Sequence, residues 1–149
     1  MAIRYAVDTN VLVRLSHRTD PQHGLIAESI RRLELQKVEL CLTYQNLGEF
    51  WNVSTRPLDK NGFGLSVHET DRRFRDLIRT MTVLEEIEEV FHTWLHVLVI
   101  HQVCGVQVHD AHIAATLEVH GIAHLLTLNT PDFKRFPNLI PIHPRDVQP

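Results

Sequence analysis

The sequence predicts an α/β fold in which a mostly parallel five-stranded sheet has helices on both faces. Short apolar stretches alternate along the chain with longer segments that have helical spacing. Such alternation is typical of parallel strands joined by helical crossovers. No internal repeat, low-complexity segment or linker divides the 149 residues, and this length suits one domain. We therefore expect residues 1–149 to form a single domain.

Five apolar stretches are the predicted strands. The first of them begins without an amphipathic pattern, which favours a central position in the sheet. Pro141 lacks a backbone N–H, so the last strand is expected at an edge of the sheet. The predicted strands cover residues 3–7, 38–42, 81–84, 124–128 and 139–142.

Helices are predicted between the strands, with clear signals at their ends. Residues that favour a helix N-terminus are Asp8, Asp20, Thr43, Ser66 and Asp110. Ser66 begins a capping box, and Gly121 is expected to end the helix that Asp110 opens. The helix after the third strand has an apolar stripe that is expected to face the core, made of Ile87, Val90, Phe91, Trp94, Leu95 and Leu98. Trp51 is likewise expected in the core.

The composition indicates an ordinary globular protein, with 44% hydrophobic and 22% charged residues. Cys41 and Cys104 lie in apolar surroundings and are expected to be buried free thiols in a reducing compartment. Charge occurs too early for a signal peptide, and no apolar run approaches the roughly 20 residues of a membrane span. We therefore expect a cytoplasmic protein. The formal net charge of −3 does not indicate a strongly basic nucleic-acid-binding domain, and it does not exclude nucleic acid as a substrate.

Acidic residues recur where predicted strands give way to helices, at Asp8, Glu49, Asp110 and Asp132. In an open α/β sheet these junctions gather on one edge, so side chains far apart in sequence share a pocket. Crowded carboxylates repel one another unless they are protonated or bridged by a cation. A hard divalent ion neutralises such a cluster and binds phosphates. Each acid alone has a simpler role as a helix cap or dipole partner, but their combined placement favours a metal-dependent phosphodiester enzyme.

The same residues carry a family resemblance. They occur in the segments Asp8-Thr9-Asn10-Val11-Leu12, Asn46-Leu47-Gly48-Glu49-Phe50-Trp51, His109-Asp110-Ala111 and Leu126-Thr127-Leu128-Asn129-Thr130-Pro131-Asp132-Phe133. In this order and spacing, the chain resembles PIN-domain ribonucleases, and most of all the VapC-type toxins of bacterial toxin–antitoxin pairs. The resemblance covers about residues 3–141.

This resemblance implies a Rossmann-like, three-layer α/β/α sandwich that cleaves RNA with Mg²⁺ or Mn²⁺. Asp8, Glu49 and Asp110 would be the catalytic, metal-binding acids. The hydroxyls of Thr9 and Thr127 would support the pocket. A small antitoxin protein and a homodimer are the implied protein partners, with an antitoxin segment inserted over the acidic cleft.

The fourth acidic position of the family falls on an amide here, Asn129. An amide oxygen can bind or orient a ligand but adds no negative charge. Asp132 is the candidate replacement, so both residues are candidate metal ligands. Asn46 is a candidate supporting residue, because it belongs to a polar strip beside Glu49.

Substrate contacts are predicted less specifically. The candidates are Arg14, Arg18, His109 and His112, with Arg72, Arg73, Lys134 and Arg135 as further phosphate contacts. For any one arginine, ordinary helix-surface charge is the simpler interpretation. The histidine pairs His92/His96 and His109/His112 have helical spacing but lack the further ligands of a tetrahedral zinc site.

Two other classes of function compete with the nuclease. A non-catalytic module that binds RNA or protein is favoured by the amide at Asn129, and metal binding separates it from an enzyme. A phosphatase-type Mg²⁺ hydrolase is disfavoured, because such enzymes place a second acid two residues after the aspartyl nucleophile and this chain has Asn10 there.

Overall fold

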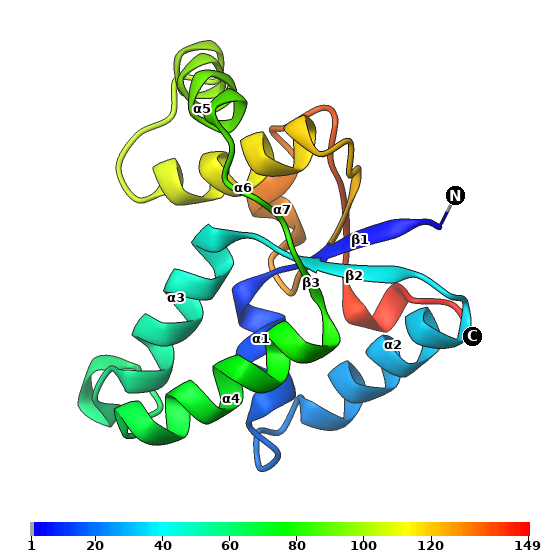
Figure 1. The fold of residues 1–149 in the computed structure, drawn as a ribbon, viewed down its shortest axis with the longest axis vertical. Coiled ribbons are helices and arrows are strands. Elements are labelled where there is room, and N and C mark those ends of the chain that lie inside the picture. Colours follow the sequence, from blue (N-terminus) through cyan, green and yellow to red (C-terminus); the bar gives the residue numbers. More distant parts are fainter. Residues whose placement is uncertain (1) are drawn as a thin grey trace.

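The computed structural model describes residues 2–149 and contains one five-stranded, all-parallel sheet (Figure 1). The strands are β1 (Arg4–Val7), β2 (Glu39–Leu42), β3 (Thr82–Val83), β4 (His124–Leu126) and β5 (Ile140–Ile142). Their order across the sheet is β3-β2-β1-β4-β5. The central position of β1 and the edge position of β5 confirm both predictions about strand placement.

Helices cover both faces of this sheet and make the structure a three-layer sandwich, as predicted. They are α1 (Thr9–Ser16), α2 (His23–Leu35), α3 (Tyr44–Thr55), α4 (Val67–Thr80), α5 (Glu88–Ile100), α6 (Gln107–Val119) and α7 (Thr130–Phe133), with 3-10 turns at Leu58–Lys60 and Pro144–Asp146. Figure 1 shows α1 to α4 below the sheet and α5 and α6 above it. Within residues 2–149, no helix combines the length and apolarity that a bilayer crossing requires.

The alternation of side chains along the strands divides the core in two. Val7 and Leu126 pack with the helices of the first face, whereas their neighbours Ala6 and Leu125 pack with α5, α6 and the buried Phe133. Successive strand residues point to opposite faces, so a strand buried on both sides carries an unbroken apolar run. This explains why the central strands of the sequence lack an amphipathic pattern.

Three of the predicted helix caps form as expected. Asp8 starts α1, where its side chain accepts from the Thr9 backbone N–H at 2.8 Å. The Thr43 side chain accepts a hydrogen bond from the Asn46 backbone N–H at 3.0 Å, which starts α3. Ser66 accepts from the Glu69 N–H at 3.0 Å and starts α4. The Glu69 carboxylate instead pairs with the arginines at positions 72 and 73, so the capping box is half formed.

Two helices begin at other residues than predicted. α2 begins at His23, because Asp20 forms a local turn in which its side chain accepts from the Gln22 N–H at 2.8 Å. α6 begins at Gln107, so Asp110 lies inside the first turn of the helix and does not cap it. Asp110 is therefore held on a regular helix rather than at a loop junction.

Three predictions of burial were wrong. Cys104 is exposed in the connection between α5 and α6, next to Gly105, whose φ of +58° turns the chain. Phe91 and Leu95 are 58% and 52% exposed, because α5 turns Val90 and Val97 toward the rest of the molecule. The apolar stripe of α5 is therefore wider than the part of the helix that packs against the rest of the protein. Trp94 is half-buried and packs against the core between the sheet and α5 and α6, as predicted, and Trp51 is half-buried beside Phe74.

Candidate functional site

The predicted acids meet in one cleft at the carboxyl edge of the sheet. The cleft has a volume of about 510 Å³, and its lining includes Asp8, Glu49, Asp110, Asn129 and Asp132. These residues lie on the connection after β1, on α3, on α6 and around α7. All five therefore lie together at the predicted edge of the sheet, although they are separated by up to 124 positions of sequence.

Asp8 is the most enclosed of these acids, with 6% of its surface exposed. Its Oδ1 accepts from the Thr9 N–H at 2.8 Å and from Asn46 Nδ2 at 3.2 Å, and its Oδ2 accepts from Thr127 Oγ1 at 2.7 Å. Burial raises the pKa of Asp8 to about 6, against the lowering effect of these hydrogen bonds. An ionised carboxylate offers about four acceptor sites, so at least one remains for a ligand.

Glu49 is oriented by two side-chain donors. Its Oε2 accepts from Thr9 Oγ1 at 2.7 Å, and its Oε1 accepts from Gln45 Nε2 at 3.0 Å. Thr9 therefore joins the two acids, since its backbone contacts Asp8 and its hydroxyl contacts Glu49. The three predicted supporting residues, Thr9, Asn46 and Thr127, all contact the acids directly.

Asp110 experiences the strongest crowding of charge. Burial raises its pKa to about 7, and the charges of Asp8, Glu49 and Asp132 add to the effect. Unlike Asp8, this carboxyl has no hydrogen-bond donor among residues 2–149 to offset the repulsion. The site thus contains carboxylates that a bound cation would stabilise.

Asn129 and Asp132 lie at the exposed rim of the cleft. The Asn129 backbone N–H donates to Thr127 Oγ1 at 3.0 Å, which ties the rim to the hydroxyl that contacts Asp8. Both the amide of Asn129 and the carboxylate of Asp132 border the cleft. The structure thus leaves both as candidates for the family's fourth acidic position.

The donor set fits a hard divalent ion. It consists of carboxylate and amide oxygens, which suit Mg²⁺ and Mn²⁺. Within residues 2–149, no three His, Cys, Asp or Glu side chains are already gathered closely enough to enclose an ion. Mg²⁺ keeps several of its waters and needs few protein ligands, so this open arrangement fits a partly hydrated ion better than a closed protein cage.

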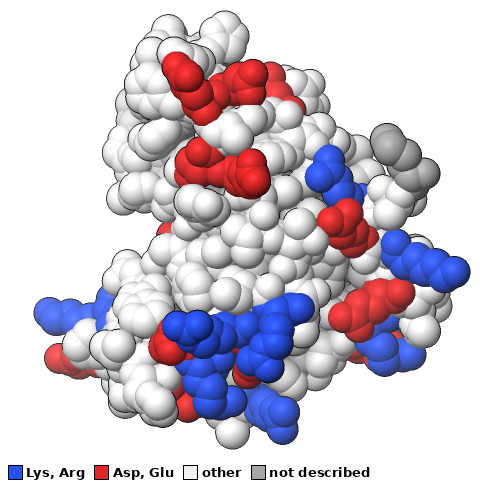
Figure 2. Space-filling model, viewed as in Figure 1, with Lys and Arg blue, Asp and Glu red and all other residues white. Residues whose placement is uncertain are grey.

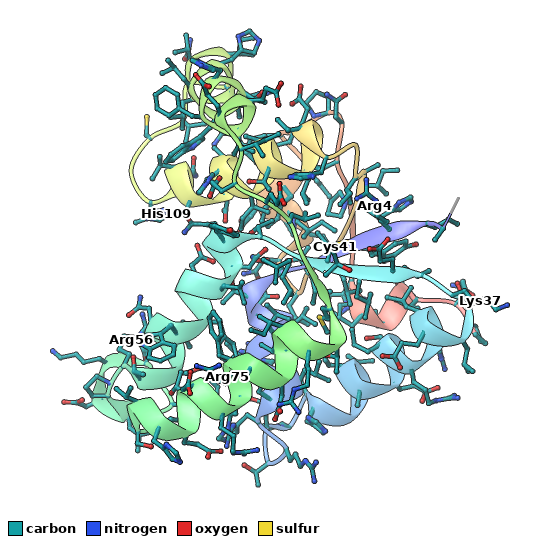
Figure 3. All side chains as sticks on the ribbon, viewed as in Figure 1. Arg4, Lys37, Cys41, Arg56, Arg75 and His109 are labelled. Carbon is teal, nitrogen blue, oxygen red and sulfur yellow. The ribbon has the colours of Figure 1, made fainter. Side chains whose placement is uncertain are left out.

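Two arginines, Arg14 and Arg56, also line this cleft. The Nε atoms of both are buried without a hydrogen-bond partner among residues 2–149, and Arg14 Nε forms an ion pair with Asp20 Oδ1 at 3.8 Å. Other atoms of these guanidiniums donate to the backbone carbonyls of Asn10 and Asn61. Figure 3 shows Arg56 at the end of α3. Arg56 was not among the predicted site residues, because it lies outside the four segments that carry the family resemblance.

The remaining predicted substrate contacts do not line this cleft. His109 is exposed near the start of α6 (Figure 3), and His112 is turned toward Gln45 and Glu86. Arg18 lies with the α4 arginines in a separate hollow of about 240 Å³. Arg135 lines an adjoining hollow that shares Asp110 and Asp132 with the cleft.

The arginines of α4 form a basic surface of their own, visible in Figure 2, with acidic residues clustered on the upper part of the same face. Arg72 and Arg73 both pair with Glu69, and Arg75 pairs with Asp71 at 2.9 Å. These paired guanidiniums are typical of a helix surface, where ion pairs add little stability.

Comparison with known proteins gives a consistent family assignment. A family model described as the PIN domain matches residues 5–139. A chain in the structure of VapBC2 from Rickettsia felis bound to a promoter DNA fragment is similar, with a TM-score of 0.70 and 16% identity over 95% of this chain and 98% of that one. Comparison with curated protein sequences gave no significant match.

Two further structures share the fold. VapBC-1 from nontypeable Haemophilus influenzae has a TM-score of 0.66 and 22% identity over 95% of this chain and 98% of that one. VapC20 from Mycobacterium tuberculosis, described as a sarcin–ricin loop cleaving toxin, has a TM-score of 0.60 and 20% identity over 81% and 86% of the two chains. At these identities the likeness concerns the fold. Because the family model spans most of the chain and the acids share one cleft at the sheet edge, the protein belongs to the PIN-domain family.

Proposed function

We propose that this PIN-domain protein is a metal-dependent endoribonuclease that acts as the toxin of a type II toxin–antitoxin pair. The observation that carries the proposal is the cleft that Asp8, Glu49 and Asp110 line together with Arg14 and Arg56. Carboxylates suited to a cation, together with guanidiniums suited to phosphate, are the two halves of a phosphodiester-binding site. The VapC and VapBC structures with the same fold support the toxin role.

In this proposal the three acids hold Mg²⁺ or Mn²⁺, with Asn129 or Asp132 available at the rim. A bound ion would supply a water of lowered pKa and neutralise charge on the phosphate. Thr9, Asn46 and Thr127 keep the carboxylates oriented through the hydrogen bonds described above. Arg14 and Arg56 bind the phosphates that flank the bond to be cleaved.

We further propose that a small antitoxin covers the acidic cleft and that the protein forms a homodimer in the cytoplasm. A segment carrying an arginine would pair with the carboxylates that otherwise hold the metal. Expression of the protein alone should slow growth, and co-expression with an antitoxin encoded beside it should restore growth. Unimpaired growth at high expression of the wild-type protein would contradict the toxin role.

The nuclease activity is tested with purified protein, defined RNAs and Mn²⁺ or Mg²⁺. We expect cleavage that a chelator abolishes and that Asp8→Ala or Asp110→Asn reduces by at least a hundredfold. Asp71→Asn is the matched control, because Asp71 is paired with an arginine on α4 and does not line the cleft. Equal cleavage by the parent and the two cleft variants would contradict the proposal.

The competing function is a PIN-domain module that binds RNA or a protein without cutting. It is favoured by the amide at Asn129 and by the absence of a preassembled three-ligand set within residues 2–149. Calorimetry with Mn²⁺ alone distinguishes the two. Binding that Asp110→Asn abolishes supports the enzyme, whereas no binding by the parent supports the module.

A further inference from the structure

A chain of hydrogen bonds connects Glu49 on α3 with His112 on α6 and with Glu86 before α5. His112 Nε2 lies 2.6 Å from Glu86 Oε1, and His112 Nδ1 lies 2.9 Å from Gln45 Oε1. Gln45 Nε2 in turn donates to Glu49 Oε1 at 3.0 Å. The chain therefore runs from the connection before α5, through α6, to two residues one turn apart on α3.

The direction of each hydrogen bond follows from the chemistry of its partners. An ionised Glu49 only accepts, so the NH₂ group of Gln45 faces it and the Gln45 oxygen faces His112. His112 Nδ1 must therefore carry a proton and donate. Nε2 faces the Glu86 carboxylate, so a proton also lies between those two atoms. Every link has one donor and one acceptor, which makes the chain fully satisfied.

The environment of His112 holds its ring in one orientation. Only 13% of the side chain is exposed. The Trp94 ring stacks on the imidazole with centroids 4.4 Å apart and planes 21° apart. Trp94 Nε1 donates to the Val108 carbonyl at 3.0 Å, which attaches the indole to α6 itself. A ring fixed on one face by an indole and at both nitrogens by hydrogen bonds is a rigid element.

We propose that His112 and Gln45 are positioning residues that set the separation of Glu49 on α3 from Asp110 on α6. This inference rests on the proposed metal-dependent function. His112 lies two residues after Asp110, and Gln45 lies one turn before Glu49, so their hydrogen bond joins the two helices that carry the acids. Loss of the His112–Gln45 bond leaves the Gln45 amide free to rotate, so its Nε2 donor is no longer held against Glu49.

Partners that orient metal-binding side chains without contacting the metal typically change affinity or activity 10- to 100-fold when they are mutated. We therefore expect Gln45→Met and His112→Phe each to weaken Mn²⁺ binding about tenfold. Both substitutions keep much of the side-chain volume, and phenylalanine keeps the stack on Trp94. The kcat for RNA cleavage should fall about tenfold, whereas KM should stay within about twofold because neither residue lines the cleft.

The double variant and a rescue variant distinguish positioning from general damage. Gln45→Met and His112→Phe break the same chain, so the double variant should be no worse than the poorer single variant. His112→Asn keeps an amide donor near the position of Nδ1 and should recover at least threefold in Mn²⁺ affinity over His112→Phe. His92→Phe is the control, since His92 is an exposed histidine on α5 that does not line the cleft.

The measurements are calorimetry with Mn²⁺ alone, steady-state RNA cleavage, and thermal unfolding to verify that each variant is folded. If His112→Phe does not fold, Gln45→Met and His112→Asn test the chain without it. If the parent protein binds Mn²⁺ and cleaves RNA, and Gln45→Met and His112→Phe match it in Mn²⁺ affinity and kcat, the positioning role is refuted and the proposed function stands. The positioning role is also refuted if the double variant loses Mn²⁺ affinity by the product of the two single-variant losses. A parent that neither binds Mn²⁺ nor cleaves RNA would refute the proposed function and the positioning role together.

Discussion

Asp8 and Asp110 both have raised pKa values, but they differ in what surrounds them. Asp8 is buried and receives hydrogen bonds from Thr9, Asn46 and Thr127. Asp110 is half-buried and has three acidic neighbours whose charges raise its pKa further. The metal-free site therefore contains unfavourable charge that residues selected for stability alone would avoid.

Asp110→Asn should stabilise the metal-free protein at high pH. The folded state raises the pKa of Asp110 from 3.8 to about 7, so it favours the protonated carboxyl. The protonated carboxyl therefore favours folding relative to the ionised one. This contribution to the free energy of unfolding is fully present below about pH 4 and is lost as the pH rises through about 7. We expect the variant to gain roughly 1–2 kcal/mol over the parent at pH 8, an amount reduced by solvent screening of a half-exposed group. Its advantage should be smaller at pH 5.

The test is denaturant unfolding with a chelator present at pH 5 and pH 8. Asp71→Asn is again the control, because Asp71 is only partly buried on α4 and belongs to an ion pair with Arg75. A parent and an Asp110→Asn variant that lose stability equally between the two pH values would contradict the assigned charge crowding.

Arg56→Ala should weaken RNA binding without changing the chemical step. Arg56 lines the cleft, and in the proposed function its guanidinium binds a phosphate and takes no part in the chemical step. We expect KM to rise about five- to tenfold with kcat within twofold, and the salt dependence of RNA binding to weaken by roughly 0.7 in log–log slope for one lost contact on a single strand. Arg75→Ala, which removes an arginine paired with Asp71 on α4, should change neither value. An unchanged salt dependence in Arg56→Ala would exclude the phosphate contact.

At the level of elements, α3 connects helix capping to the site. Thr43 starts this helix by accepting from the Asn46 N–H, and its hydroxyl donates to Asn46 Oδ1 at 2.7 Å. That contact orients the Asn46 amide toward Asp8. The cap therefore serves two purposes, because it stabilises the helix and places a donor on the buried carboxylate.

Thr43→Ala and Ser66→Ala form a matched pair that separates these purposes. Each removes an N-cap and should cost about 1 kcal/mol in the free energy of unfolding. Only Thr43→Ala should also reduce Mn²⁺ affinity and RNA cleavage, since Ser66 starts α4 and does not line the cleft. Denaturant unfolding and calorimetry measure the two effects. Equal losses of Mn²⁺ affinity in both variants would show that the effect is general destabilisation.

At the level of the whole molecule, the cleft joins the two faces of the sheet. One wall belongs to α1 and α3 on the first face, and the other to α6 and α7, which pack with the second core. An ion held by Asp8, Glu49 and Asp110 would thus bridge helices on both faces. Ion binding is therefore expected to stabilise the fold as a whole.

Mn²⁺ should raise the unfolding temperature, and more strongly as the pH increases. A ligand at 100 times its Kd stabilises the folded state by about 2.7 kcal/mol. Binding requires Asp8 and Asp110 to lose protons, and their pKa values are about 6 and about 7. The stabilisation should therefore grow between pH 5.5 and 7.5 as both groups ionise without the ion. Thermal unfolding with Mn²⁺ or with chelator measures this stabilisation. If Mn²⁺ raises the unfolding temperature of Asp110→Asn as much as that of the parent, the ion binds elsewhere.

Much of the fold could be predicted because its signals are local. The central position of β1 follows from its apolar run, and the edge position of β5 from Pro141. Thr43 contacts a backbone group only three residues away, and Gly121 adopts the positive φ that its place after α6 indicates. The shared cleft of Asp8, Glu49 and Asp110 was predictable because parallel strands bring their carboxyl ends to one edge.

The sequence by itself determined the order of elements, the caps and the edge of the sheet where the acids gather, since these depend on residues a few positions apart or on the direction of the strands. Only the tertiary structure decided that Arg56 lines the same cleft as the acids and that Glu86 and Gln45 hold His112. It also decided that Phe91 and Cys104 stay exposed. Partners and burial of this kind depend on distances between segments far apart in the chain, and periodicity and capping patterns carry no information about those distances.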